Sequence, residues 1–161
     1  MVWIIMGVSG SGKTTIGRML ASELGIPFYD ADGFHPPENI KKMSSGRPLD
    51  DQDRKPWLET LAREIQKWNS NDGAVLACSA LKKSYRVILA SKSRDEDVQF
   101  IYLKGDRDTI LKRMKSRSGH YMPPELLDSQ FDALEEPADA ISVSINKTPQ
   151  VIVNEILARL S

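Results

Sequence analysis

The 161-residue sequence predicts an α/β fold, a five-stranded parallel sheet flanked by helices. Five short apolar stretches have the composition of buried strands, and segments with apolar residues at helical spacing lie between them. A glycine-rich loop joins the first of these strands to the first helix. Strands that alternate with helices form parallel sheets through right-handed crossovers, so we expect a single domain spanning residues 1–161.

The chain begins with a strand and a helix. Residues 2–6 are an apolar run, which predicts a strand covered on both faces. Ile16, Leu20 and Leu24 then recur at helical spacing over residues 13–24, and Gly25 marks the end of that helix. The intervening loop therefore connects the end of a strand to the start of a helix.

This loop has the pattern of a phosphate-binding loop. Its glycines let successive backbone N–H groups point inward, and the helix N-terminus adds partial positive charge where phosphate oxygens would lie. Lys13 would reach the β- and γ-phosphates, and the Thr14 hydroxyl would ligate Mg²⁺. A flexible Gly/Ser turn is the alternative, which the flanking strand and helix disfavour. The predicted nucleotide-binding residues of the loop are Gly7, Val8, Ser9, Gly10, Ser11, Gly12, Lys13 and Thr14.

A second short strand is predicted over residues 28–32, and its end carries the carboxylates of Asp30 and Asp32. The carboxyl ends of parallel strands meet at one edge of a sheet, so both carboxylates should lie near Lys13. If the strand includes both residues, their side chains point to opposite faces, and we expect them to have different roles. The strand at 74–78 ends in Cys78 where many phosphate-loop proteins have a Mg²⁺-ordering Asp, so Asp30 or Asp32 should supply that ligand.

Two helical segments precede the third strand. Residues 38–49 are polar and predict a short helix and a turn, and a longer helix with Pro56 near its first turn follows. Asp50 and Asp51 lie at the start of the longer helix, where a carboxylate either caps free N–H groups or contacts a ligand. The sequence leaves both possibilities open.

Three cations cluster at the start of the helix that follows the third strand. Lys82, Lys83 and Arg86 stand where positive charge is unfavourable to the helix dipole. This placement indicates an anionic ligand, and a solvated basic face is the equally weighted alternative.

The fourth strand is predicted at 98–103, and Asp106 is a suitable cap for the helix after it. Arg113 and Arg117 on that helix are four residues apart, hence neighbours on one face. They lead into a Gly- and Pro-containing connection, which we interpret as a lid at roughly 117–124 that brings arginines over a nucleotide. An ordinary basic helix face is the alternative.

The fifth strand is predicted at 141–145, and Pro149 begins the last helix. No internal repeat or low-complexity tract interrupts this pattern.

Composition narrows the possible functions. Lys plus Arg and Asp plus Glu each total 22, so the net charge is zero and no overall field favours nucleic acid or an anionic membrane. A single cysteine excludes an intramolecular disulfide, and no apolar run reaches the length of a membrane span. We therefore expect a cytoplasmic protein without nucleic-acid or membrane partners.

The motifs resemble those of gluconokinases of the small phosphate-loop type, and the resemblance covers nearly the whole chain. Its later motifs are more specific than the phosphate-binding loop, which a very large superfamily shares. Besides that loop, the matching residues are Phe28 to Asp32, His35-Pro36, Asn39, Lys42-Met43, Gly46, Pro48-Leu49, Asp51 to Arg54, Pro56 to Leu58, Cys78 to Lys83, Tyr85-Arg86, His120 to Pro123, Leu127, Ser129 to Phe131 and Leu134-Glu135.

The resemblance implies ATP-dependent phosphorylation of D-gluconate at its 6-hydroxyl, giving 6-phosphogluconate and ADP. It also implies a P-loop fold of the nucleoside-monophosphate-kinase type with a short lid, a helical acceptor-binding region at roughly 35–70 and a homodimer. Similarity to the related shikimate kinases assigns Mg²⁺ ordering to Asp30 and contact with the acceptor hydroxyl to Asp32. With Lys13 and Arg117, Asp32 completes the predicted catalytic set.

The remaining site residues divide between the two substrates. Candidates for the gluconate carboxylate are Arg54, Lys82 and Arg86, with Arg54 preferred, and candidates for its hydroxyls are His35 and Asp53. Similarity to adenylate kinases suggests that Arg113 stacks on adenine, that Arg117 contacts phosphate and that Pro149 covers the other adenine face.

Three other functions are the alternatives. A kinase of the same architecture could act on another acceptor, such as a shikimate-like acid or a nucleotide. A GTP-dependent switch would use Asp30 to Gly33 as a D-x-x-G element and Asn146-Lys147 as a guanine-reading motif, but Pro149 stands where that motif needs an Asp. A nucleotide-binding module without catalysis is disfavoured because Lys13, Thr14 and both carboxylates are present.

Overall fold

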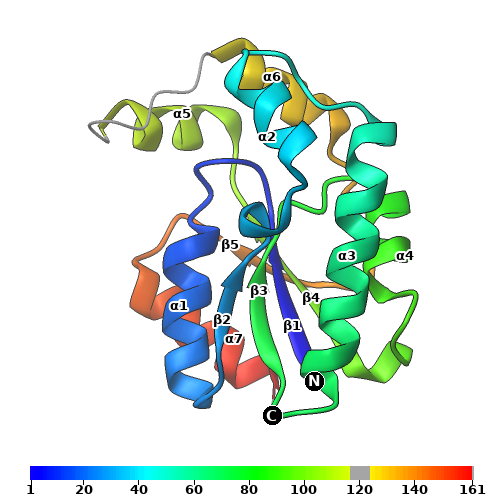
Figure 1. Cartoon of the computed structure of the whole chain (residues 1–161). Helices are drawn as coiled ribbons and strands as arrows, with labels where there is room; N and C mark the ends of the chain where they lie inside the picture. Colours follow the sequence, from blue (N-terminus) through cyan, green and yellow to red (C-terminus); the bar gives the residue numbers. More distant parts are fainter. Residues whose placement is uncertain (117–123, 161) are drawn as a thin grey trace.

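The computed structural model describes residues 1–116 and 124–160, and it contains the predicted five-stranded sheet (Figure 1). All pairings are parallel, in the order β2-β3-β1-β4-β5. The strands are β1 (Val2–Met6), β2 (Phe28–Asp30), β3 (Ala74–Ala77), β4 (Val98–Lys104) and β5 (Ile141–Ser144). Since the chain leaves β1 toward β2 and β3 and later crosses to β4 on the other side, the loop after β1 lies at the topological switch point, where open α/β sheets bind ligands.

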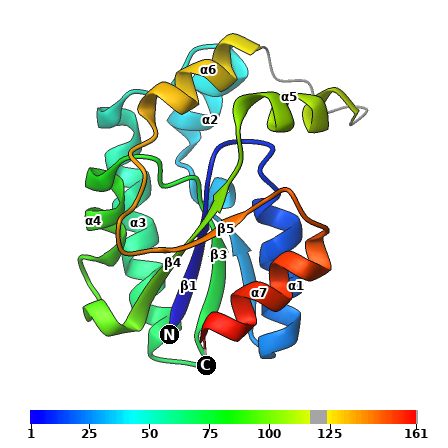
Figure 2. The ribbon, with the colours of Figure 1, turned by 180° about the vertical axis from the view of Figure 1, so that it is seen from behind.

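Helices cover both faces of the sheet and its upper edge. Helices α1 and α7 lie on one face, α3 and α4 lie on the other, and α2, α5 and α6 lie beyond the carboxyl ends of the strands (Figures 1 and 2). The helices are α1 (Lys13–Leu24), α2 (Pro37–Ser44), α3 (Asp51–Asn69), α4 (Lys83–Ala90), α5 (Arg107–Ser116), α6 (Pro124–Ala133) and α7 (Pro149–Leu160), with 3₁₀ turns at Ala31–Phe34 and Asp95–Asp97. None of the helices in the described residues is long and apolar enough to cross a membrane.

The apolar strands make two separate cores. Ile4 faces a core that contains Leu61 and Leu89, whereas its neighbour Ile5 faces the other, with Leu20 and Ile156. All six side chains are completely buried. Alternation along a strand covered on both faces explains why residues 2–6 are uniformly apolar. These two cores hold the carboxyl edge of the sheet, and the loops on it, in place.

The second strand is shorter than predicted. It ends at Asp30, whose Oδ1 accepts a hydrogen bond from the backbone N–H of Asp32 at 3.0 Å and so starts the 3₁₀ turn. A side chain that bonds the backbone two residues ahead competes with the strand conformation. The expected alternation of Asp30 and Asp32 across one strand is therefore wrong, since only Asp30 belongs to it.

Helix α3 begins at Asp51, about one turn before the start that was predicted from Pro56. Asp50 and Asp53 form a reciprocal capping box, in which Asp53 N–H donates to Asp50 Oδ1 at 2.8 Å and Asp50 N–H donates to Asp53 Oδ2 at 3.0 Å. This box satisfies free N–H groups ahead of Pro56, which consequently lies inside the helix rather than near its first turn. Of the two possibilities for Asp50, the structure shows capping.

Candidate active site

The loop from Gly7 to Thr14 forms a cradle of backbone at the switch point. Its three glycines have φ angles of 150°, 80° and 98°, which other residues adopt at a cost. A Cβ on Gly7 would lie 2.8 Å from Ser11 Oγ, so the loop closes tightly on itself. Ser11 Oγ is itself buried and has no hydrogen-bond partner among the described residues. A closed cradle with an unsatisfied hydroxyl and a helix N-terminus behind it fits a phosphate group.

The side chain of Lys13 folds back onto the backbone of the phosphate loop. Its Nζ donates to the carbonyl oxygens of Gly7 and Val8, both at 3.1 Å. Burial lowers the pKa of Lys13, and interactions with the acidic groups Cys78, Asp32 and Asp30 oppose that shift. The ammonium therefore lies in a partly desolvated place beside two carboxylates, where it can neutralise charge that develops on a phosphoryl group.

Asp30 and Thr14 meet at the mouth of the loop. Thr14 Oγ1 donates to Asp30 Oδ2 at 3.5 Å, which places a hydroxyl and a carboxylate oxygen together where β2 ends. Hard oxygen donors of this kind suit Mg²⁺, which binds through one or two protein ligands together with water and substrate phosphates. The described residues hold no group of three or more His, Cys, Asp or Glu that could bind a metal without such help.

Asp32 lies in the 3₁₀ turn after β2 and interacts electrostatically with Lys13. Partial desolvation and the neighbouring charge of Asp30 raise the pKa of the Asp32 carboxyl, whereas His35 and Lys13 oppose the shift. A carboxylate whose pKa is raised is a better proton acceptor, and perturbed groups of this kind concentrate at functional sites. The electrostatic contact of His35 with both Asp32 and Arg54 extends the site from the loop toward α3.

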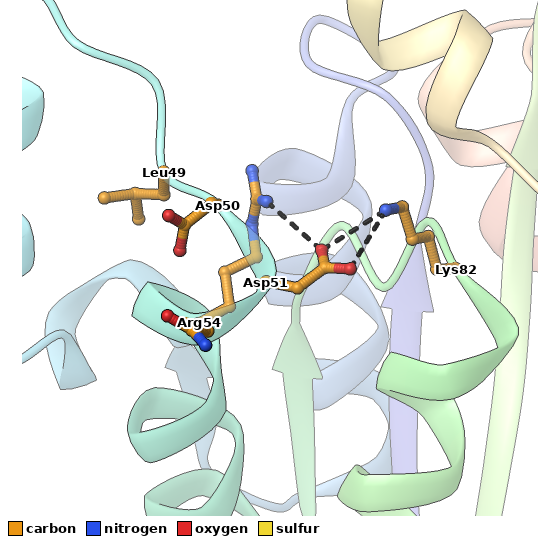
Figure 3. A pocket seen from close by; sticks show the side chains of 6 residues that line it. Leu49, Asp50, Asp51, Arg54 and Lys82 are labelled. Atoms are coloured by element: carbon orange, nitrogen blue, oxygen red, sulfur yellow. Dashed lines mark hydrogen bonds and ion pairs between the residues drawn. The ribbon is translucent and has the colours of Figure 1, made fainter.

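An open depression of about 510 Å³ continues the site, lined by Leu49, Asp50, Asp51, Gln52, Arg54 and Lys82 (Figure 3). Asp51 lies among its cations: Lys82 Nζ is 3.2 Å from Oδ1 and Arg54 Nη1 is 4.0 Å from it. The Tyr85 hydroxyl also donates to Asp51 Oδ1, at 2.5 Å. This bond, followed by the one from Lys82, lowers the pKa of Asp51. The depression thus holds two cations around one carboxylate on the surface.

Two predicted acceptor residues have internal partners instead. Asp53 belongs to the capping box and pairs with Lys42 Nζ at 2.5 Å, so its carboxylate serves the start of α3. Arg86 is buried, and its guanidinium donates to the carbonyls of Ala80 at 2.7 Å and Glu135 at 2.8 Å. Both side chains stabilise the walls of the site, and neither lines the depression.

A second pocket, of about 240 Å³, lies against the phosphate loop and the start of α1. It brings Arg113 of α5 and Pro149 of α7 to Ser11 and Gly12, as expected of residues that enclose a nucleoside. Arg113 also donates through Nη2 to the carbonyl of Ile145. Arg117, His120 and nearly all of the predicted lid at 117–124 lie outside the described residues.

Gln130 also belongs to the site, although its sequence context predicted no role for it. From α6, its Oε1 accepts from the N–H of Ser9 at 2.7 Å, and its Nε2 donates to Ser9 Oγ at 2.9 Å. The two residues are 121 positions apart, so no local pattern could reveal the contact. Gln130 links the helix that follows the lid region to the phosphate loop.

We expect Gln130→Ala to weaken ATP binding roughly tenfold. Each lost hydrogen bond contributes about 0.5–1.5 kcal/mol to the ordered loop, and two are lost. Titration calorimetry with a non-hydrolysable ATP analogue measures the effect. Ser129→Ala is the matched control, because Ser129 is exposed on the same helix. Unchanged or tighter binding in the Gln130 variant would contradict the positioning role.

Comparisons with known proteins find similar sequences and a similar fold among kinases. A family model described as Shikimate kinase matches residues 9–161. The thermosensitive gluconokinase of Escherichia coli K12 is 49% identical over 149 residues, which cover 89% of this chain and 79% of that protein. A probable gluconokinase of Xenopus tropicalis is 44% identical, with 97% of this chain and 91% of that protein covered. The crystal structure of a gluconokinase from Sinorhizobium meliloti 1021 superposes with a TM-score of 0.89 at 41% identity, covering 99% of this chain and 92% of that chain.

Proposed function

The chain belongs to the gluconokinase family, and from this premise we propose that it transfers the γ-phosphoryl group of ATP to the 6-hydroxyl of D-gluconate. The products are 6-phospho-D-gluconate and ADP. One observation in the structure carries the proposal: the chain has two depressions of different chemistry, one lined by the phosphate loop and one at the starts of α3 and α4. The pocket with Arg113 and Pro149 suits a nucleoside. In the other depression Arg54 and Lys82 surround Asp51, and these two cations suit the carboxylate of a small acid.

Lys13 of the phosphate loop and the neighbouring Asp32 have the properties that phosphoryl transfer requires. The reaction depends mainly on positioning and charge neutralisation, which the backbone N–H groups of the loop and Lys13 provide. Asp32 orients the acceptor hydroxyl and accepts its proton, a role that its raised pKa favours. His35 contacts the hydroxyls of the sugar acid. The resemblance assigns phosphate contact to Arg117, which lies outside the described residues.

The proposal includes Mg²⁺, held by Thr14 and Asp30. Bound there, the ion would supply positive charge that neutralises the phosphates. We further propose that the enzyme acts in the cytoplasm as a homodimer, and light scattering coupled to size-exclusion chromatography measures the oligomeric state.

The direct test is Mg²⁺-dependent ATP turnover with a panel of acceptors: D-gluconate, other sugar acids, free sugars, shikimate and nucleoside monophosphates, with GTP as an alternative donor. We expect ADP release only with gluconate, and a product that 6-phosphogluconate dehydrogenase oxidises. Activity confined to another acceptor would overturn the proposed substrate, and GTP hydrolysis without an acceptor would indicate a switch protein.

We expect Arg54→Ala to raise the KM for gluconate about 10- to 100-fold and to change that for ATP less than about twofold. A hydrogen bond to a charged group contributes about 1.5–3 kcal/mol, and Arg54 lines only the acceptor depression. Steady-state kinetics with each substrate varied in turn separates the two constants. Lys55→Ala removes the neighbouring exposed charge and serves as the control. Equal effects on both substrates would contradict the assignment of Arg54 to the carboxylate.

A further inference from the structure

Two contacts fix the imidazole of His35, one on its face and one at its edge. Its ring stacks on Trp57, with centroids 4.2 Å apart and an interplanar angle of 14°. Trp57 is in turn anchored, since its Nε1–H donates to the carbonyl of Ala31 at 2.8 Å. The remaining constraint comes from Asn39 of α2, whose Nδ2 lies 3.2 Å from His35 Nδ1. The imidazole therefore has one defined orientation relative to the turn that carries Asp32.

Asn39 also has one defined orientation. It is 4% exposed, and the same Nδ2 donates to the backbone carbonyl of Asp53 at 2.9 Å. Because a carbonyl only accepts hydrogen bonds, the atom facing it must be the amide NH₂ rather than the amide oxygen. The NH₂ group has two hydrogens, so one bonds to Asp53 and the other is directed at His35 Nδ1.

A donor directed at Nδ1 determines where the imidazole carries its proton. We infer that Asn39 holds His35 as the Nε2–H tautomer, so that His35 presents a hydrogen-bond donor to the acceptor substrate. Nδ1 must be unprotonated to accept from Asn39, and a neutral imidazole then has its hydrogen on Nε2. Asn39 is thus a positioning residue that acts through His35.

The electrostatic surroundings agree with a neutral ring. Burial lowers the pKa of His35, the charge of Arg54 lowers it further, and the charge of Asp32 opposes both. The assignment deepens the proposed function and rests on it for the identity of the substrate. A fixed N–H donor selects an oxygen that can accept, such as a hydroxyl or carboxylate of the sugar acid, and it disfavours an ammonium group at that position.

The tautomer can be measured without any substrate. The chain has two histidines, so long-range ¹H–¹⁵N correlation spectra of the uniformly ¹⁵N-labelled full-length protein contain two imidazoles, which His120→Gln assigns. At a pH well above the ordinary histidine value of about 6.5, we expect His35 to show a protonated Nε2 and an unprotonated Nδ1. A protonated Nδ1, or an averaged mixture of tautomers, in the wild-type protein overturns the inference even if every variant fails to fold.

Asn39→Asp is the variant that tests the role of Asn39. It replaces the amide hydrogen-bond donor by a carboxylate of the same size, which can only accept a hydrogen bond from His35. We expect it to move the proton of His35 to Nδ1 or to protonate the ring fully. An unchanged Nε2–H signal in a folded Asn39→Asp protein would show that Asn39 does not determine the tautomer of His35.

Kinetics test what the donor does. His35→Gln keeps an amide N–H close to the position of Nε2, whereas His35→Leu has no donor. We expect the leucine variant to raise the KM for gluconate about tenfold with little change in that for ATP, and the glutamine variant to recover most of the loss. Equal losses in both variants would contradict the donor role. A wild-type enzyme with the Nε2–H tautomer but no gluconate-dependent turnover would instead refute only the proposed function.

Discussion

Asp32→Asn is expected to reduce kcat by about 10²- to 10⁴-fold while ATP binding stays close to normal. This range is the usual contribution of a positioned general base, and the asparagine keeps the size of the side chain while losing its ability to accept a proton. Asp32 lies in the turn after β2 and interacts electrostatically with Lys13 of the phosphate loop and with His35, so it is suitably placed to orient an acceptor hydroxyl. Single-turnover rates and titration with an ATP analogue separate chemistry from binding.

Asp30→Asn provides the comparison for that prediction. Asp30 contacts Thr14 and caps the 3₁₀ turn, so its loss should raise the Mg²⁺ concentration needed for half-maximal activity. If Asp32→Asn retained a near-normal rate, Asp32 would have no part in the mechanism. The two assignments would have to be exchanged if the Asp32 variant were the one rescued by additional Mg²⁺.

The sequence predicted the fold because its signals are local. Apolar runs on doubly covered strands, glycines at the loop and residues such as Gly25 at a helix end each reflect nearby physical requirements. The same applies to the strand and helix on either side of the phosphate loop. The prediction for β2 was wrong for a local reason as well, since the Asp30 side chain competes with the strand for the backbone N–H of Asp32.

Local sequence signals could not predict the partners of the charged side chains. Arg86 bonds a carbonyl 49 residues away, and Lys42 reaches Asp53 from a different helix. In sequence, Asp53 and Arg86 look like Arg54 and Lys82, because all are charged residues near predicted helix starts. Only the packing of α2, α3, α4 and the segment after α6 decides which of them line the depression and which support its walls.

Lys13→Ala is expected to lower kcat/KM for ATP by at least about 10²- to 10³-fold, the usual cost of removing one preorganised charge-stabilising donor. The ammonium of Lys13 donates to the carbonyls of Gly7 and Val8, which places it at the phosphate cradle. The variant should therefore also lose most of the rise in Tm that a saturating ATP analogue gives the wild type, because ligand stabilisation depends on the ratio of ligand concentration to Kd. Lys13→Arg is the matched control: it keeps the charge but presents a planar fork instead of a compact ammonium, and we expect only partial recovery. Full activity in the alanine variant would mean that the backbone N–H groups of the loop alone neutralise the transferred phosphoryl group.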